Sequence, residues 1–169
     1  MAGRQADLFG TLASRSGKPE PKPEQKPAGI DEVVINADGG SRGNPGPAGI
    51  GAVVALPDGT VLAEIAEGIG HTTNNVAEYK AVIAGLERAH ELGARRVKVR
   101  ADSKLVIEQL KGTWKVRQPH LVPLRDAAKQ AARRFERVSY EHVRREYNKA
   151  ADALANQAMD TQAALRRGR

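Results

Sequence analysis

The sequence predicts an α/β protein whose five-stranded mixed sheet has three antiparallel strands followed by two parallel ones, with helices flanking the sheet. Two observations support this fold class. In the first part of the chain, apolar strand-like runs are joined by short loops rich in glycine and proline, which is typical of an antiparallel meander. In the rest of the chain, helical patterns alternate with further strand-like runs, which is typical of helices packed against a sheet.

The first three strands are expected at EVVINAD (32–38), IGAVVAL (50–56) and TVLAEIAEGI (60–69). A glycine-rich loop separates the first strand from the second. The turn before the third strand contains Pro57 and Gly59, which favour a tight turn. These short connections predict that consecutive strands are antiparallel neighbours.

The remaining elements are helices and two more strands. The helix at 72–93 begins with threonine and asparagine residues, which are common helix caps, and Gly93 is its expected stop. Asn148 is expected to cap the last helix. The other elements are a strand at 95–102, helices at 103–112 and 119–135, a strand at 137–145 and the last helix at 148–159.

The chain of 169 residues is long enough for one domain, expected at 30–165. A disordered Pro/Lys-rich tail is expected at 1–29, because KPEPKPEQKP offers no apolar side chain to bury, and a basic tail is expected at 166–169. No run of eighteen apolar residues and no signal-peptide segment is present, so no membrane partner is expected. The absence of cysteine excludes disulfides and fits a cytoplasmic protein.

Charge is distributed unevenly along the chain, whose net charge is +7. Residues 30–94 contain three basic and nine acidic side chains, whereas residues 95–149 contain sixteen basic and six acidic ones. A basic segment of this density suits a phosphate backbone. The alternative is a set of solvated helix faces, and charge alone does not decide between the two.

Four carboxylates occupy positions where a merely solvated charge is unexpected. Asp38 ends the first strand and Asp102 ends the fourth, so a right-handed crossover between parallel neighbours would bring both to the carboxyl edge of the sheet. Glu78 is expected in the first turn of its helix, on or beside the face that packs on the sheet. Asp152 lies at the border of the apolar face of the last helix.

Each carboxylate also has an ordinary structural interpretation. An aspartate at a strand end is often a turn or cap residue, and Asp152 could complement a helix dipole. Glu78 is hardest to explain in this way, because an inward carboxylate is costly unless it is paired. Four carboxylates at one sheet edge would repel one another, and a hard divalent cation such as Mg²⁺ is the natural counter-charge in a chain without cysteine.

Four motifs, in this order and spacing, resemble the type 1 ribonuclease H family: DGGSRGNPGPAG at 38–49, TTNNVAEYKAVIAGL at 72–86, ADSKLV at 101–106 and NKAADALA at 148–155. The resemblance covers residues 31–160. No single motif is decisive, but four in register are highly specific. The resemblance implies a ribonuclease H-like fold and an endonuclease that cuts the RNA strand of an RNA–DNA hybrid, leaving 5′-phosphate and 3′-hydroxyl ends.

The resemblance also implies which residues do the chemistry. Asp38, Glu78, Asp102 and Asp152 correspond to the family's four metal-binding carboxylates. Two Mg²⁺ ions per site, with Mn²⁺ as the alternative, would activate a water and stabilise the leaving 3′-oxygen. Asp38 would be shared between the ions, and Glu78 would also accept a hydrogen bond from the 2′-hydroxyl beside the cut.

Substrate contacts are implied by the same resemblance. The glycines of the first motif would let the backbone approach a wide minor groove, and nearby polar side chains would meet ribose hydroxyls, base edges and a DNA-strand phosphate. Helix capping is the alternative role for Thr73, Asn74 and Asn75, and packing is the alternative for Trp114. The implied contact residues are Gly39, Gly40, Ser41, Gly43, Asn44, Thr73, Asn74, Asn75, Lys104 and Trp114.

Two features of many family members are absent from this sequence. The junction YEHVRREYNKAAD has no room for the mobile histidine loop, and His142 is not expected to replace it. Arg145, beside that junction, is predicted to assist proton transfer or product release electrostatically. The link Gly112–Pro119 is too short for a basic protrusion, so other basic residues must hold the substrate. Lys104 stands where glutamine is frequent, which predicts a phosphate contact.

Residues 5–9, QADLF, resemble the pentapeptide by which bacterial replication and repair proteins dock on the sliding clamp. Gln5, Leu8 and Phe9 are its most restrictive positions. A motif in an extended tail is accessible to a partner. The sliding clamp is therefore a predicted partner, with a role in DNA replication and repair, and a chance match is the alternative.

Two other functions remain open from sequence alone. A non-catalytic hybrid-binding module would keep the fold without turnover, although it would gain nothing from an expensive anionic cluster. A nuclease resembling transposases or Holliday-junction resolvases would instead cut DNA. In every case a monomer is expected.

Overall fold

The structure is a computed structural model that describes residues 29–168. Its elements follow the predicted order of three strands, a helix, a strand, two helices, a strand and a helix. They are β1 (Glu32–Ser41), β2 (Gly46–Ala55), β3 (Val61–Thr72), α1 (Asn74–Glu91), β4 (Arg96–Ala101), α2 (Lys104–Lys111), the 3-10 turn η2 (Pro119–Leu121), α3 (Val122–Ala132), β5 (Arg137–His142), the 3-10 turn η3 (Arg145–Tyr147) and α4 (Lys149–Arg167).

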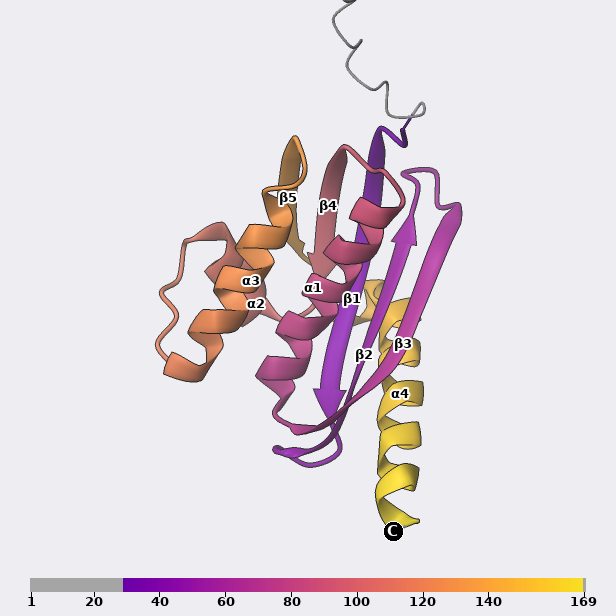
Figure 1. Cartoon of the computed structure of the whole chain (residues 1–169), viewed down its shortest axis with the longest axis vertical. Helices are drawn as coiled ribbons and strands as arrows, with labels where there is room; N and C mark the ends of the chain where they lie inside the picture. Colours follow the sequence, from indigo (N-terminus) through magenta and orange to yellow (C-terminus); the bar gives the residue numbers. More distant parts are fainter. Residues whose placement is uncertain (1–28, 169) are drawn as a thin grey trace, which may run out of the picture.

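The five strands form one mixed sheet in the order β3-β2-β1-β4-β5 (Figure 1). β1 pairs antiparallel with β2, and β2 with β3, whereas β4 is parallel to both β1 and β5. The predicted fold class is therefore confirmed. The parallel register sets Ala37 opposite Ala101, so Asp38 is the first residue of β1 beyond the end of β4.

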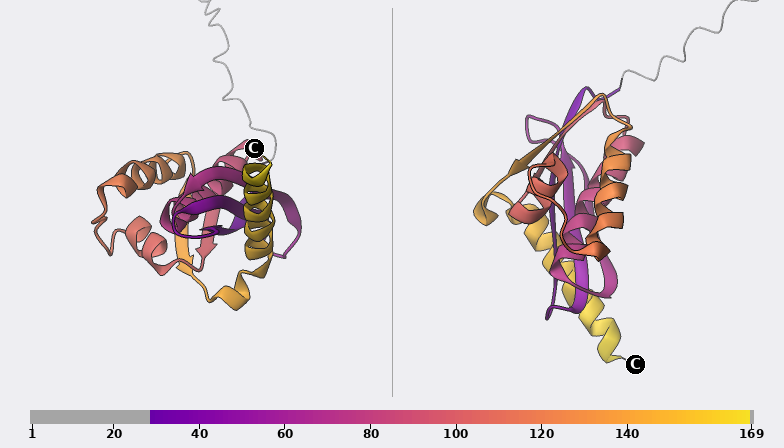
Figure 2. Two further views of the ribbon diagram at one scale, coloured as in Figure 1. Left: turned by 90° about the horizontal axis from the view of Figure 1, so that it is seen from below. Right: turned by 90° about the vertical axis from the view of Figure 1, so that its left-hand side faces the viewer.

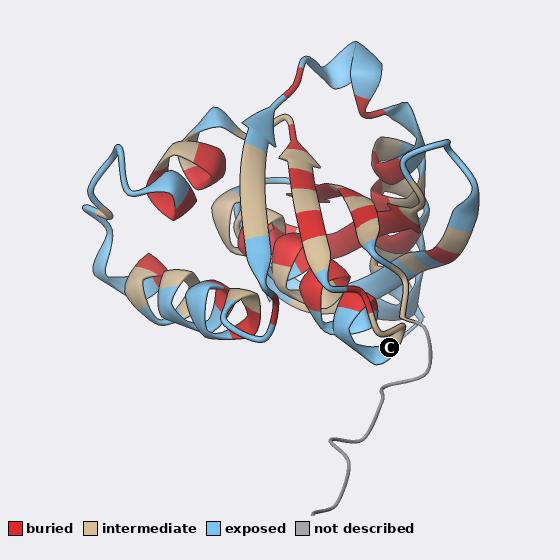
Figure 3. Ribbon diagram, turned by 90° about the horizontal axis from the view of Figure 1, so that it is seen from above, coloured by how far each residue is buried: buried red, intermediate tan, exposed pale blue. Residues whose placement is uncertain are grey.

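Helices cover both faces of the sheet. α1 packs on β1 and β2, with α3 beside it, and α4 crosses β1, β2 and β3 on the opposite face (Figures 1 and 2). The strand pattern explains this, because alternate residues point to opposite faces. Val33 and Ile35 are fully buried on the α1 side together with Tyr79 and Leu86 of α1. Figure 3 shows the buried residues gathered where the sheet meets the helices.

Two glycines allow the helices to approach the sheet closely. A Cβ on Gly39 would lie 2.3 Å from the backbone carbon and oxygen of Ala77 in α1. A Cβ on Gly51 would lie 2.3 Å from the backbone oxygen of Ala151 in α4. Real Cβ atoms do not approach backbone this closely, so only glycine fits at either position. Both contacts lie next to the carboxyl edge where the predicted acidic residues gather.

Several boundaries differ from the sequence predictions. β1 does not end at Asp38 but continues to Ser41, because β2 supplies ladder partners for Gly39, Gly40 and Ser41 after β4 has ended. Gly39 and Gly40 are thus strand residues, and of the three predicted loop glycines only Gly43 has a positive φ (89°).

The second half of the chain also departs from the predicted boundaries. β5 ends at His142 rather than at 145, and η3 follows it. Asn148 stands at the N-cap position of α4 but makes no side-chain cap hydrogen bond, which corrects its predicted role. α4 continues through Arg166 to Arg167, which were expected in the basic tail.

Within residues 29–168, none of the helices combines the length and apolar character needed to cross a membrane. The predicted clamp-binding residues Gln5, Leu8 and Phe9 lie outside the described residues, so that motif stays a prediction.

Candidate active site

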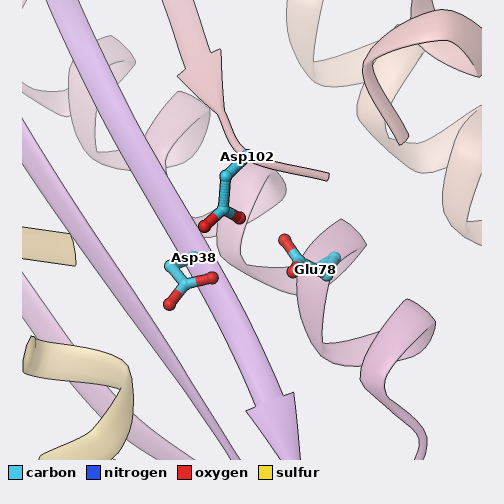
Figure 4. Close-up of side chains that lie close together, drawn as sticks. All are labelled: Asp38, Glu78 and Asp102. Carbon is cyan, nitrogen blue, oxygen red and sulfur yellow. The ribbon is translucent and has the colours of Figure 1, made fainter. Parts of the chain in front are cut away.

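Three of the four predicted carboxylates converge at the carboxyl edge of the sheet (Figure 4). Asp38 comes from β1, Asp102 directly follows β4, and Glu78 reaches the same point from α1. Each offers a carboxylate oxygen, and these three oxygens all lie within 4.8 Å of one another. Asp38 is 7% exposed, and the other two side chains are partly buried. This is a set of hard oxygen ligands that suits a divalent cation.

The local structure explains why these residues meet. Parallel pairing brings the end of β4 beside β1, which places Asp102 next to Asp38 on the same sheet face. The missing side chain of Gly39 lets α1 approach β1 at Ala77, and the next residue is Glu78. Glu78 lies in the second turn of α1 and not in the first, since the helix begins at Asn74. Its predicted inward orientation still brings it to the cluster.

The fourth carboxylate, Asp152, lies in the first turn of α4 at the border of the cluster. It lies near enough to Asp38 to contribute, after burial and the charge of Asp102, to the raised pKa of Asp38. Its Oδ1 also accepts a hydrogen bond from Arg145 Nη2 at 3.3 Å. Within the described residues, Asp152 is not one of the group whose ligand atoms lie within 4.8 Å of one another.

Burial and mutual repulsion perturb these groups strongly. Burial, followed by the charge of Asp102, raises the pKa of Asp38 from 3.8 to about 8. Burial and the charge of Asp38 raise the pKa of Glu78 well above its usual value. Burial also raises the pKa of Asp102, although the Arg145 guanidinium opposes this. Carboxylates whose pKa values are raised together in this way are costly to ionise without a nearby cation, which is typical of a functional site.

Asn148 holds the start of α4 in place. The sequence analysis predicted it only as a helix cap and not as a residue of the site. Its side chain is 1% exposed, and its Nδ2 donates a hydrogen bond of 2.9 Å to the carbonyl oxygen of Ala37. That contact ties the first turn of α4, with Asp152, to the residue before Asp38. The only signal in the sequence was the position of an asparagine four residues before the aspartate.

The predicted contact residues of the first and second motifs bind one another. Asn74 Oδ1 accepts hydrogen bonds from Ser41 N (2.9 Å) and Ser41 Oγ (3.2 Å), and Asn74 N donates to Asn44 Oδ1 at 3.1 Å. Thr73 caps α1 by accepting a hydrogen bond from Val76 N. The two motifs therefore form one continuous surface beside the carboxylates.

A cavity of about 460 Å³ surrounds the cluster. It brings Gly39, Gly40, Ser41 and Asn74 together with the four carboxylates and Arg145. Residues that the sequence did not single out also line it, namely Arg42, Val143, Arg144, Asn156 and Met159. His142 is another lining residue, and its Nε2 lies 3.2 Å from the carbonyl oxygen of Asp102.

Lys104 and Trp114 lie outside that cavity but next to each other. The Nζ of Lys104 is 5.8 Å from the centre of the Trp114 ring, which is 43% exposed. Trp114 lines a second cavity of about 540 Å³ with Lys115 and Arg117. An exposed aromatic ring among cations is a surface that suits a nucleic-acid strand.

A five-stranded mixed sheet with carboxylates from β1, α1 and β4 at its edge defines the ribonuclease H-like class of proteins. Comparison with known proteins agrees: a family described as "Reverse transcriptase-like" matches residues 36–158. A ribonuclease H of Phenylobacterium zucineum is 35% identical over 149 residues, which are 80% of this chain and 95% of that protein. The chain belongs to the type 1 ribonuclease H family.

Solved structures show the same relationship. The N-terminal RNase H domain of Rv2228c from Mycobacterium tuberculosis has a TM-score of 0.78 at 56% identity, covering 79% of this chain and 97% of that chain. LC11-RNase H1, solved in complex with an RNA/DNA hybrid, has a TM-score of 0.73 at 41% identity, and the match covers 76% of this chain and 97% of that chain. The full bifunctional Rv2228c protein is 57% identical over 133 residues, which are 78% of this chain but only 36% of that protein.

Proposed function

We propose that the protein is an endonuclease that hydrolyses the RNA strand of RNA–DNA hybrids, leaving 5′-phosphate and 3′-hydroxyl ends. The convergence of the Asp38, Glu78 and Asp102 carboxylates carries the proposal. Burying them together destabilises the fold in the absence of a cation, as their raised pKa values indicate. A module that only binds hybrids would gain nothing from this cost.

The donor set fits Mg²⁺, with Mn²⁺ as the alternative, because every ligand is a carboxylate oxygen. Asp38, Glu78, Asp102 and Asp152 would hold two ions. When bound, such ions supply activation of a water and stabilisation of the leaving 3′-oxygen. Glu78 would also accept a hydrogen bond from the 2′-hydroxyl beside the cut, which makes cleavage depend on RNA.

The surface beside the cluster would hold the hybrid. The missing side chains of Gly39 and Gly40 are explained by the packing of Ala77 and Met159 against β1. Their backbone, with that of Gly43, would lie beside the minor groove, which Ser41, Asn44, Asn74 and Asn75 can meet. Thr73 and Lys104 would contact phosphates, and Trp114 would lie against the DNA strand. The complex of LC11-RNase H1 with an RNA/DNA hybrid supports this assignment, since its fold superposes on this chain.

Arg145 would take the place of the absent histidine loop, aiding proton transfer or product release. Its Nη2 lies 3.3 Å from Oδ1 of Asp152. An Arg145→Ala variant is expected to lower kcat on a hybrid by about tenfold or more, because a charge beside the reacting groups is lost. Steady-state cleavage at saturating Mg²⁺ measures kcat. An unchanged kcat would contradict the proposed role of Arg145.

The deciding experiment offers a labelled RNA–DNA hybrid to the wild-type protein with Mg²⁺, and again with excess chelator. Cleavage of the RNA strand alone is expected, with 5′-phosphate ends and complete loss of activity after chelation. Double-stranded and branched DNA serve as controls. Cutting of the DNA substrates would favour a transposase- or resolvase-like nuclease, and binding without cleavage under varied metal would favour the hybrid-binding module.

We further propose that the QADLF segment docks the protein on the bacterial sliding clamp, which would place its activity in DNA replication and repair. The segment's composition supports this, and the structure does not describe it. Wild-type protein is expected to co-elute with the clamp in size-exclusion chromatography, and Leu8→Ala/Phe9→Ala protein is expected not to. Wild-type protein that elutes separately would end the proposal. A cytoplasmic location and a monomeric state also remain predictions.

A further inference from the structure

Arg42 is a cation of the catalytic cavity that the proposed mechanism does not use. It directly follows β1 and lines the cavity together with the carboxylates. Its Nε and Nη2 donate hydrogen bonds of 3.1 and 2.9 Å to the same oxygen, Oδ1 of Asp160 in α4. Asp160 follows Met159, which is another lining residue of the cavity. The arginine is therefore tied to α4 at the border of the site.

The fold holds both partners of this pair in place. Arg42 N donates a hydrogen bond of 2.8 Å to Pro47 O, which closes the loop between β1 and β2. A Cβ on Gly49 would lie only 2.6 Å from Met159 N, so α4 packs tightly on β2 immediately before Asp160. Figure 1 shows the loop and the C-terminal half of α4 at the same end of the sheet. The guanidinium is thus fixed in one orientation.

The pairing leaves part of the Arg42 guanidinium for a ligand. Asp160 occupies the edge formed by Nε and Nη2, and no acceptor within residues 29–168 occupies Nη1. The side chain is 44% exposed. Among the described residues, the charges that shift the pKa of the three clustered carboxylates do not include Arg42. An arginine edge of this kind can bind two oxygens of a phosphate at once.

We propose that Arg42, positioned by Asp160, binds a phosphate of the RNA strand beside the scissile one. The inference rests on the proposed function, since it takes an RNA–DNA hybrid as the substrate. The scissile phosphate must lie on the carboxylates, and Arg42 lines the same cavity. It follows Asp38 by four residues of extended chain, which is about 13 Å along β1. The arginine is therefore placed for a neighbouring phosphate of the cleaved strand.

Steady-state cleavage of a labelled hybrid by the full-length protein tests this contact. In Arg42→Ala, KM is expected to rise about three- to tenfold while kcat stays within about twofold, because a phosphate that does not react is bound equally before and in the transition state. The slope of log KM against log salt is expected to fall by about 1, which is the loss of one phosphate contact.

Arg88→Ala is the matched control for a lost surface arginine. The Arg88 side chain is 50% exposed, and its Nη1 lies 3.1 Å from Glu91 Oε2. It lines a cavity between α1 and β3 together with four glutamates, where a nucleic acid would be repelled. Its removal is expected to leave KM within about twofold of the wild-type value.

Replacing Asp160 separates positioning from charge. Asp160→Ala removes a negative charge, which by itself would tighten the binding of an anionic hybrid. Because the aspartate positions Arg42, KM is instead expected to rise about two- to fivefold. In an Arg42→Ala background, the same change is expected to raise KM no further. Arg42→Lys is expected to recover only part of the loss, because an ammonium lacks the planar fork that binds two partners.

Hybrids with a single neutral methylphosphonate linkage locate the contact. The linkage is placed in turn at the phosphates beside the cut in the RNA strand and at the facing phosphates in the DNA strand. With wild-type protein, one RNA-strand position is expected to raise KM, and Arg42→Ala is expected to be insensitive at that position. Insensitivity that appears only at a DNA-strand position would overturn the proposal.

The outcomes separate this inference from the function on which it rests. Wild-type protein that cleaves no hybrid would contradict the proposed function itself. Cleavage by wild-type protein with an unchanged KM in Arg42→Ala would contradict only the phosphate contact. A KM that falls in Asp160→Ala would rule out positioning by the aspartate. A lower Tm and kcat in Arg42→Ala at unchanged KM would show that the pair only ties the loop to α4, which also overturns the inference.

Discussion

Replacing Asp38 by asparagine is expected to reduce hybrid cleavage by about a thousandfold or more. The amide keeps the size of the side chain but cannot carry the negative charge that holds a divalent cation. After burial, the charges of both Asp102 and Asp152 raise the pKa of Asp38. Single-turnover cleavage of a labelled hybrid with saturating Mg²⁺ measures the loss.

The same substitution is expected to stabilise the protein when no metal is present. The pKa of Asp38 is raised in the fold from 3.8 to about 8, so its contribution to stability is fully present below about pH 4 and is lost as the pH rises through 8. Asparagine carries no charge at any pH and avoids this loss. In chelator, Asp38→Asn is therefore expected to raise Tm more at pH 8.5 than at pH 5, with a gain of about 1–3 kcal/mol at the higher pH.

These opposite changes distinguish a catalytic effect from misfolding. A misfolded variant would lose activity and stability together, whereas Asp38→Asn is expected to lose activity and gain stability. Asp58→Asn is a suitable control, because Asp58 lies in the turn between β2 and β3, where its Oδ1 accepts a hydrogen bond from Thr60 N. Retained cleavage by Asp38→Asn, or a Tm that falls at pH 8.5, would contradict the assignment of Asp38.

The position of these aspartates could be predicted because it depends on strand ends. Asp38 and Asp102 follow apolar runs of similar length, and parallel pairing of those runs brings both to one edge. The actual end of β1 could not be predicted, since Gly39 and Gly40 are poor strand residues in isolation. Their extended conformation depends on pairing with Ile50 and Gly49 of β2, which is a tertiary contact.

Other contacts of the site depend on residues that are distant in the chain. Asn148 reads as a helix cap in the sequence, but its amide donates to Ala37, 111 positions earlier. Arg145 was predicted from its place beside the junction, whereas its pairing with Asp152 required the 3-10 turn that aims it back at α4. Sequence patterns report which face a residue occupies, and the distances between elements come from packing.

Glycine at position 39 is expected to matter for both stability and catalysis. In Gly39→Ala, the new Cβ would lie 2.3 Å from the backbone of Ala77, so α1 must move away from β1. Overpacking of this kind costs about 1–3 kcal/mol, and urea denaturation should show a lower midpoint with an unchanged slope. Since Glu78 follows Ala77, the same movement would withdraw its carboxylate from Asp38 and Asp102, and cleavage is expected to fall even where the variant remains folded.

Gly40→Ala is the matched control for stability, because it adds the same methyl group to the next residue of β1. There the new Cβ would lie 3.2 Å from Met159 Cε, the end of a flexible side chain that can turn aside. Its loss of stability is therefore expected to be smaller than that of Gly39→Ala. Equal losses in the two variants would show that β1 merely tolerates no added side chain here. A larger loss in Gly39→Ala, accompanied by weaker Mg²⁺ binding, would identify close packing of α1 on β1 as the feature that positions Glu78.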